Sequence, residues 1–278
     1  HRDLHSFPTR RSSDLENGAD MNLNRIDGMN SLIIAAQNGF SAAVSFLLDK
    51  GVDINIRETS YNTTALMQAA INGYPEIVRL LLERGADPGM QNNAGATALL
   101  LATQNVHTQV ARLLIEKEKD PDLKDSEGFT ALMMASRSGS TEIVQMLLDK
   151  GAQVNLLSND GISPLMQASI NGHSEIIRLL IENGARIDLQ RSDGFSALML
   201  ASLNGHTDAV KILLDRGAKI DLQRTDGATA LIVAARNGHE NVIKMLLERG
   251  ANRDIMDNTG KTFLDYSGRS GIRNPEVD

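Results

Sequence analysis

A phrase that returns every 33 residues dominates this sequence. Its clearest copy, RSDGFSALMLASLNGHTDAVKILLDRGAKIDLQ, spans residues 191–223. Glycines and leucines recur in step with it: Gly95, Gly128, Gly161, Gly194, Gly227 and Gly260, and Leu66, Leu99, Leu132, Leu165, Leu198, Leu231 and Leu264. A fixed period of this length is typical of proteins that stack many copies of one small unit.

The first half of the phrase predicts a turn followed by a short helix. Asp193-Gly194 is a turn dipeptide suited to the tip of a hairpin. Ser196 stands where an N-cap hydroxyl would accept a hydrogen bond from the free N–H groups of a helix. Asn204-Gly205 is expected to end this helix, because both residues tolerate the left-handed backbone of a C-cap.

The second half predicts another short helix, which starts near Thr207 and ends at Gly217. Residues 219–224 should then return as an extended segment to the next turn. Two helices of about ten residues each are not stable alone in water. We therefore expect each copy to depend on the copies stacked above and below it.

The order T-x-L-x-x-A, then N-G-H, then L-L-x-x-G-A resembles the ankyrin repeat, from Leu15 onward and with seven full copies. The resemblance implies an all-α, ankyrin-repeat solenoid of stacked helix-turn-helix units with β-hairpin fingers. One departure recurs, because the His of the family's T-P-L-H is replaced. The replacing residues are Ile33, Met67, Leu100, Met133, Met166, Met199 and Ile232. We therefore expect packing and the turns themselves to hold the loops.

Residues 1–15 match nothing in the repeat. They resemble the translation of a sequencing adapter, so we interpret them as a non-native leader; the alternative is a disordered basic leader. Residues 16–278 form the predicted ankyrin-repeat domain, with a partial repeat at each end. The native start and any further domain would then lie outside this sequence.

Composition narrows the classes of function. The absence of cysteine excludes disulfides and thiolate metal sites. The net charge of −7 argues against non-specific nucleic-acid binding. No apolar run reaches the roughly 18–20 residues of a membrane helix, so we expect no membrane insertion. We expect a monomer without a cofactor, inside the cell and in the cytoplasm.

Two copies depart from the period. The second copy has one extra residue in the loop 58–62, where Asn62 replaces the tip glycine and Tyr61 is added. In the third copy Val106 and Glu118 replace the two helix-ending glycines. A β-branched residue is strained at positive φ, so we expect fraying or a change of curvature over 106–121.

Motifs for catalysis or metal binding are weak. Gly260-Lys261-Thr262 has the ending of a phosphate-binding loop, but its glycine is the glycine of the repeat. The evenly spaced histidines occupy one structural slot in each copy and should not converge on a metal: His107, His173, His206 and His239. We expect no enzymatic activity.

The resemblance implies that a partner protein docks on a concave face made by the hairpin tips and the first helices. The candidate residues are Tyr61, Phe129, Arg137, Ile162, Phe195, Leu203, Arg236, Asp160, Asp193 and Asp226. Exposed aromatic and Arg side chains are frequent binding hot spots, although Phe129 and Phe195 could instead pack on a neighbouring finger. The row of three Asp favours a partner with basic residues beside an apolar anchor.

These residues predict a non-catalytic scaffold for protein–protein interaction. The alternative is the recognition arm of a larger enzyme or channel whose catalytic or pore domain lies outside this sequence. If the concave face binds, Phe195→Ala and Arg236→Ala should weaken binding with little loss of stability. The resemblance also implies possible hydroxylation of a hairpin asparagine, at Asn22, Asn55 or Asn155.

Overall fold

The computed structural model describes residues 29–267 of the chain. This part is all-helical, with 15 helices and no strand. One isolated antiparallel bridge joins Gln190 to Ser196. The predicted helical fold is confirmed, whereas the predicted β-hairpins appear as loops. None of the helices in this described part has the length and apolar composition needed to cross a membrane.

The helices fall into two compact units, divided between Lys119 and Asp120. Unit 1 contains α2 (Ser31–Gln37), α3 (Ser41–Asp49), α4 (Ala65–Ile71), α5 (Pro75–Glu83), α6 (Ala98–Gln104) and α7 (Thr108–Lys117). Unit 2 contains α8 (Ala131–Ser138), α9 (Thr141–Asp149), α10 (Pro164–Asn171), α11 (Ser174–Glu182), α12 (Ala197–Leu203), α13 (Thr207–Asp215), α14 (Ala230–Arg236), α15 (Glu240–Glu248) and α16 (Phe263–Ser267).

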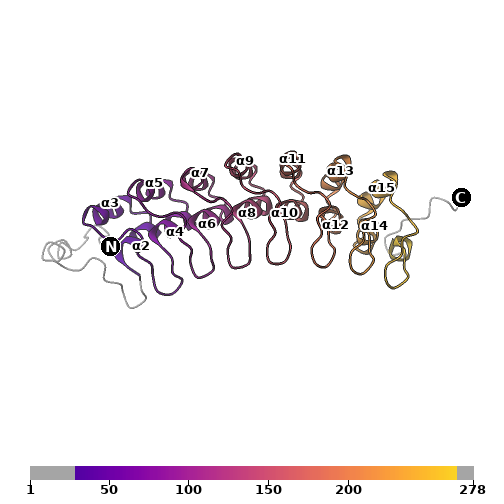
Figure 1. Ribbon diagram of the computed structural model, residues 1–278, viewed down its shortest axis with the longest axis horizontal. Coiled ribbons are helices and arrows are strands. Elements are labelled where there is room, and N and C mark those ends of the chain that lie inside the picture. Colours follow the sequence, from indigo (N-terminus) through magenta and orange to yellow (C-terminus); the bar gives the residue numbers. More distant parts are fainter. Residues whose placement is uncertain (1–28, 268–278) are drawn as a thin grey trace, which may run out of the picture. The chain divides into compact units, whose positions relative to one another are not determined.

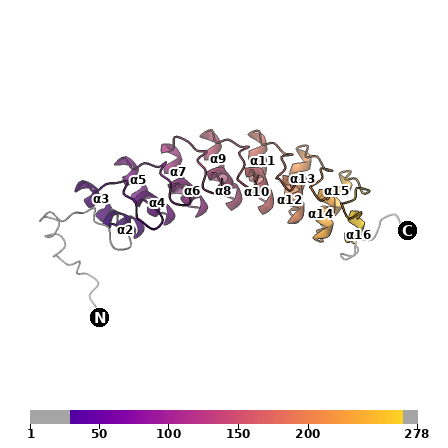
Figure 2. The same cartoon turned by 60° about the horizontal axis from the view of Figure 1, so that its bottom comes forward.

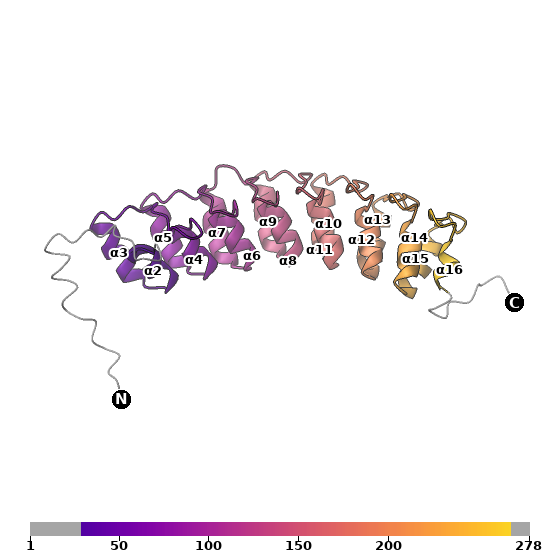
Figure 3. The same cartoon turned by 90° about the horizontal axis from the view of Figure 1, so that it is seen from below.

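Each unit has two layers of helices (Figure 1). The first helices of successive copies pack on one another, α2 on α4 on α6 in unit 1 and α8 through α16, by even numbers, in unit 2. The second helices form the other layer in the same order (Figure 2). The loop before each first helix, called its finger, projects from the edge of the unit (Figure 3). The described fingers are residues 57–64, 91–97, 124–130, 157–163, 190–196, 223–229 and 256–262.

The core consists of the same positions repeated in every copy. In the sixth copy Leu198, Met199 and Leu213 are at most 2% exposed. Each such burial stabilises the fold by roughly 1.5–3 kcal/mol. The residues that replace the family's His are all buried, as expected for a loop held by packing: Ile33, Met67, Leu100, Met133, Met166, Met199 and Ile232.

The predicted helix ends are confirmed. The hydroxyl of Ser196 accepts a hydrogen bond from the N–H of Met199 at 3.4 Å. The same capping bond starts the first helix in copies one to five and in copy seven, from Asn30, Thr64, Thr97, Thr130, Ser163 and Thr229. Gly205 and Gly217 follow their helices at φ 71° and 88°. The segment 219–224 is not fully extended, because it bends in a turn at residues 220–221.

The third copy accommodates its two substitutions in different ways. Val106 keeps the left-handed backbone of the missing glycine, with φ at 60°. The N–H of His107 still reaches the carbonyl of Ala102, at 2.9 Å. Glu118 abandons that conformation, with φ −67° and ψ 133°. The expected fraying stays a prediction, but the division at Lys119 falls inside the segment concerned.

Replacing Val106 by Gly is expected to stabilise unit 1 by about 1 kcal/mol. The change relieves the strain of a β-branched residue at positive φ, about 1–2 kcal/mol, and loses part of this through the freer unfolded glycine. Urea unfolding checks the result. Val106→Asn should fall between the two, since Asn tolerates this backbone. A Val106→Gly variant no more stable than wild type would show that the strain is relaxed elsewhere.

Candidate functional site

One side chain at the start of a finger organises its turn. In the fourth copy the Oδ1 atom of Asp125 accepts hydrogen bonds from the N–H groups of Glu127 and Phe129, at 3.0 and 2.8 Å. Asp257 accepts the same pair in the eighth copy, from Thr259 and Lys261. These side-chain bonds occupy N–H groups that a hairpin would place between strands. The fingers are therefore turns rather than β-ladders.

Neighbouring fingers of unit 2 are tied to each other. The N–H of Asn159 bonds the carbonyl of Glu127 at 2.9 Å, and its side-chain amide bonds the carbonyl of Ser126. Further along, the N–H of Thr225 bonds the carbonyl of Asp193 at 3.2 Å. These bonds fix the backbone of the fifth finger against the fourth, and that of the seventh against the sixth.

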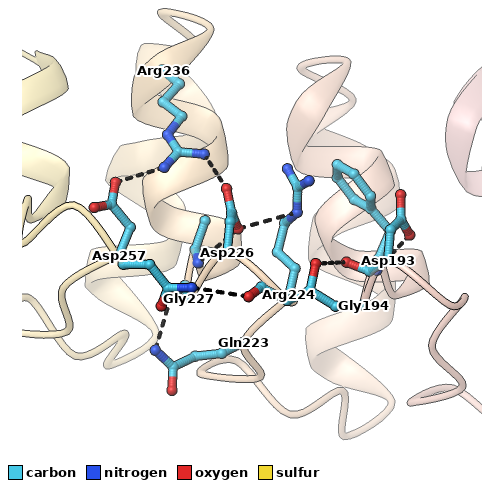
Figure 4. Close-up of polar contacts among 12 residues, drawn as sticks. Asp193, Gly194, Gln223, Arg224, Asp226, Gly227, Arg236 and Asp257 are labelled. Carbon is cyan, nitrogen blue, oxygen red and sulfur yellow. Dashed lines mark hydrogen bonds and ion pairs between the residues drawn. The ribbon is translucent and has the colours of Figure 1, made fainter.

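The sixth and seventh fingers use an ion pair instead. Arg191 and Arg224 stand where Asp125 stands. Arg191 pairs with Asp193, and Arg224 pairs with Asp226 (Figure 4). Asp193 also accepts the N–H of Phe195 at 3.3 Å. The bond from Arg191 holds the pKa of Asp193 below its usual value, despite the opposing effect of burial. The carboxylate of Asp193 therefore already has its partners within its own finger.

Arg236 links two further acids (Figure 4). Its guanidinium bonds Asp226 at 2.7 Å and Asp257 at 2.6 Å. Burial acts to raise the pKa of Asp226, but hydrogen bonds from Arg236 and the N–H of Ala228 outweigh it and keep the pKa low. Both Arg236 and Asp226 thus have internal partners, and neither is a freely available hot spot.

The aromatic residues predicted at the tips of fingers four and six are buried. Phe129 and Phe195 are 8% and 7% exposed. The Cζ atoms of Arg224 and Arg191 lie 4.0 and 5.2 Å from the ring centroid of Phe195. This corrects the expectation of exposed anchors, and for Phe195 the alternative of packing on a neighbouring finger holds. The expected stability of Phe195→Ala is corrected too, since the change would remove a buried ring.

Several of the residues predicted to bind a partner are exposed or half-buried. Arg137 and Asp160 are exposed, and Ile162 and Leu203 are half-buried. Glu127, which the sequence analysis did not select, is exposed in the same register as Asp160, one copy earlier. The 33-residue spacing could have found it. In unit 1, Tyr61 is 72% exposed, so one of the three proposed tip aromatics does face solvent.

The recurring histidines have a structural role. The Nε2 atom of His206 lies 2.9 Å from the carbonyl oxygen of Ile170 in the preceding copy. A Cβ added at Gly172 would lie 2.7 Å from the ring of His206. His107, His173 and His239 make equivalent contacts. No group of side chains in the described residues could hold a metal ion.

The phosphate-loop resemblance has an ordinary structural explanation. Gly260 forms the tip of the last finger at φ 75°. The Nζ atom of Lys261 lies 5.4 Å from the ring centroid of Tyr266. The N–H of Thr262 bonds the carboxylate of Asp265, as at the start of a helix. These three residues therefore belong to a finger and its helix cap.

The asparagines suggested for hydroxylation take part in contacts between copies. The Oδ1 atom of Asn55 accepts the N–H of Asp87 at 3.0 Å. Asn155 accepts the N–H of Arg186 at 2.8 Å and donates to the carbonyl of Gly184. Asn22 lies outside the described residues. Their modification stays a prediction.

Comparison with known families agrees with this architecture. A sequence model described as ankyrin repeats (3 copies) matches residues 13–92, 84–158, 151–224 and 216–276. These matches cover nearly the whole chain. No protein of established function matches the sequence significantly. The chain belongs to the ankyrin-repeat family.

Proposed function

We propose that this chain is a non-catalytic scaffold that binds another protein through the fingers and first helices of unit 2. Ankyrin repeats are generally protein–protein interaction modules. The proposal further holds that the chain acts in the cytoplasm as a monomer and needs no cofactor. One observation carries the proposal. The acids Glu127 and Asp160 are exposed at finger positions where Asp193 and Asp226, in the next two fingers, are paired with arginines.

Fingers four and five are the best candidates for the contact. Glu127 and Asp160 are exposed and occupy equivalent positions of adjacent fingers. Asn159 joins the two fingers through backbone and side-chain bonds. In the next two fingers the equivalent acids, Asp193 and Asp226, pair with arginines. A basic side chain of a partner would therefore find accessible carboxylates on fingers four and five.

Half-buried apolar residues lie in the same copies. Ile162 follows the tip of the fifth finger, and Ile170 is on the helix behind it. Peptides recognised here should carry Lys or Arg next to an apolar residue. Electrostatic complementarity of this kind sets specificity and association rate more than total affinity.

The double variant Glu127→Gln, Asp160→Asn is expected to bind such peptides about fivefold more weakly, since exposed ion pairs contribute up to about 1 kcal/mol each. The probes are peptides selected from a phage-displayed random library with the full chain. Asp193→Asn is the matched control, because its carboxylate already pairs with Arg191. It should leave binding unchanged. Equal binding by the double variant and the wild type would refute the proposed contact.

A further inference from the structure

The fingers and first helices of unit 1 contain fewer charged residues than those of unit 2. The sequences of the first helices of unit 1, SLIIAAQ, ALMQAAI and ALLLATQ, contain no charged residue. The third finger, QNNAGAT, contains none either. In the second finger Arg57 bonds the carbonyl of Gln91 at 3.2 Å. Its only other charged residue, Glu58, is 3% exposed. The chain as a whole carries a net charge of −7.

Tyr61 stands out from this uncharged face. It is 72% exposed, the most exposed of the large apolar side chains in the described residues. It belongs to the one finger that has an extra residue, and Asn62 beside it has φ at 61°. A large ring held in solvent gives the fold no burial energy, so its position calls for another explanation.

Glu58 fixes the backbone around Tyr61. Its carboxylate accepts hydrogen bonds from the N–H groups of Ser60 and Tyr61, both at 2.6 Å, and from Thr63 at 3.2 Å. In the third, fourth and eighth fingers the equivalent residue is the shorter Asn or Asp, which spans a shorter turn. The extra methylene of Glu58 thus matches the extra residue of this finger.

The next finger fixes the same loop from the other side. The N–H of Asn93 bonds the carbonyl of Tyr61 at 3.0 Å, and its side-chain amide bonds the carbonyl of Ser60 at 3.1 Å. Gln68 on α4 donates to the hydroxyl of Thr63. The backbone that carries Tyr61 is therefore ordered before any partner binds. Binding to a pre-ordered group loses less conformational entropy.

We propose that unit 1 carries a second docking site, for a peptide segment that has no charged side chain and that packs one aromatic or aliphatic residue against Tyr61. The proposal rests on the scaffold function but names a different surface and partner chemistry. A charged partner residue buried against the first helices or the third finger would lose its hydration without gaining an ionic partner, because neither contains a charged residue. An uncharged segment has no ionic hydration to lose. The exposed side-chain amides of Gln37 and Gln104 can form hydrogen bonds with its main chain.

The experiment uses phage-displayed random peptides selected on the full chain and sorted by the variant that abolishes their binding. Peptides that depend on Tyr61 should lose about tenfold or more in affinity with Tyr61→Ala and should lack Lys, Arg, Asp and Glu in their binding core. Gln104→Glu, which adds a charge to the face, should weaken the same peptides. Glu127→Gln with Asp160→Asn should leave them unchanged.

The outcomes separate the two proposals. Tyr61-dependent peptides rich in charged residues, or a selection that yields no Tyr61-dependent peptide, overturn the uncharged docking site. If peptides that depend on Glu127 and Asp160 are still recovered, the scaffold proposal for unit 2 survives that result. If neither class is recovered, both proposals fail.

A separate measurement tests whether Glu58 positions Tyr61. The chain contains three tyrosines, so fluorotyrosine labelling should give three ¹⁹F resonances, with Tyr61 assigned by its loss in Tyr61→Phe. Glu58→Gln places amide hydrogens against N–H donors and should move the Tyr61 resonance toward that of free tyrosine. Unmoved resonances of Tyr74 and Tyr266 would show an intact fold. An unmoved Tyr61 resonance would refute the role of Glu58.

Discussion

Replacing Gly194 by Ala is expected to lower the free energy of unfolding of unit 2 by about 3 kcal/mol. Gly194 has φ at 86°, where a side chain costs about 1–2 kcal/mol. An added Cβ would also lie 2.5 Å from the Cα of Arg224 and 2.7 Å from the backbone nitrogen of Thr225. Because both neighbours are backbone atoms of the next finger, the strain cannot be relieved by rotating a side chain.

Gly161→Ala is the matched control. Gly161 occupies the same finger position one copy earlier and has φ at 75°. An added Cβ there would meet Arg191 at 3.5 Å, an ordinary contact. We therefore expect Gly161→Ala to cost only about 1–2 kcal/mol. Urea unfolding followed by circular dichroism measures both, and equal losses would show that the approach of the next finger has no energetic importance.

The contrast between these two glycines shows what the sequence can predict. The period identifies both as tip residues with positive φ, because a turn dipeptide and a helix cap are local features. Helix bounds and caps of the sixth copy followed from the same local pattern and are confirmed. The distance from Gly194 to the next finger depends on how one copy seats on another, and no local pattern contains it.

The burial of Phe195 illustrates the limit for the binding surface. Its ring lies against guanidinium groups at positions 191 and 224, one of which belongs to the following copy. The sequence did offer a signal, because Arg191 and Arg224 replace the Glu, Asn, Asp or Ser found at the start of the other described fingers. The sequence alone does not show that an Arg at this position pairs with the Asp two residues later. That pairing depends on the geometry of the turn.

The described fingers do not form the predicted β-hairpins. The reason is again a contact that depends on the geometry of the folded turn. In the fourth finger two backbone bonds close the loop, from the N–H of Asp125 to the carbonyl of Phe129 and from the N–H of Gly128 to the carbonyl of Asp125. The N–H groups of Glu127 and Phe129 bond the carboxylate of Asp125 instead. Sequence analysis identified the Asp-Gly tip as a hairpin signal, but the acid at the start of the finger competes with strand pairing for the same donors.

Asp257→Asn is the second substitution for which we expect a large effect, a loss of about 3 kcal/mol at neutral pH. Asp257 is 4% exposed. Its Oδ1 atom accepts three hydrogen bonds from Thr259 and Lys261, and its Oδ2 atom accepts those of Arg236 and Tyr266, both at 2.6 Å. An amide nitrogen in place of Oδ2 would face two donors and strand a charged one, which costs on the order of 1–3 kcal/mol or more.

Asp125→Asn provides the control for this loss. Asp125 and Asp257 occupy the same finger position, but Asp125 accepts hydrogen bonds from two backbone N–H groups through one oxygen. In the third finger an asparagine, Asn92, already accepts the equivalent pair from Ala94 and Ala96. Asp125→Asn should therefore be nearly neutral. A large loss in Asp125→Asn would assign the effect to the finger turn rather than to the Arg236 and Tyr266 side.

The pH dependence of the stability lost in Asp257→Asn tests whether the negative charge of the Asp257 carboxylate causes the loss. Burial acts to raise the pKa of Asp257, but the hydrogen bonds from Thr259, Tyr266 and Arg236 outweigh it and hold the pKa well below that of the unfolded chain, about 3.9. A carboxyl group with a lowered folded pKa stabilises the fold above the unfolded pKa, and this stabilisation fades as the pH falls toward the folded pKa. The difference between wild type and Asp257→Asn should thus be constant down to about pH 4 and shrink below it. Hydrogen exchange of residues 257–267, measured on both proteins across this range, tests the point; a difference that does not shrink would mean that the ionised carboxylate is not what holds the last finger in place.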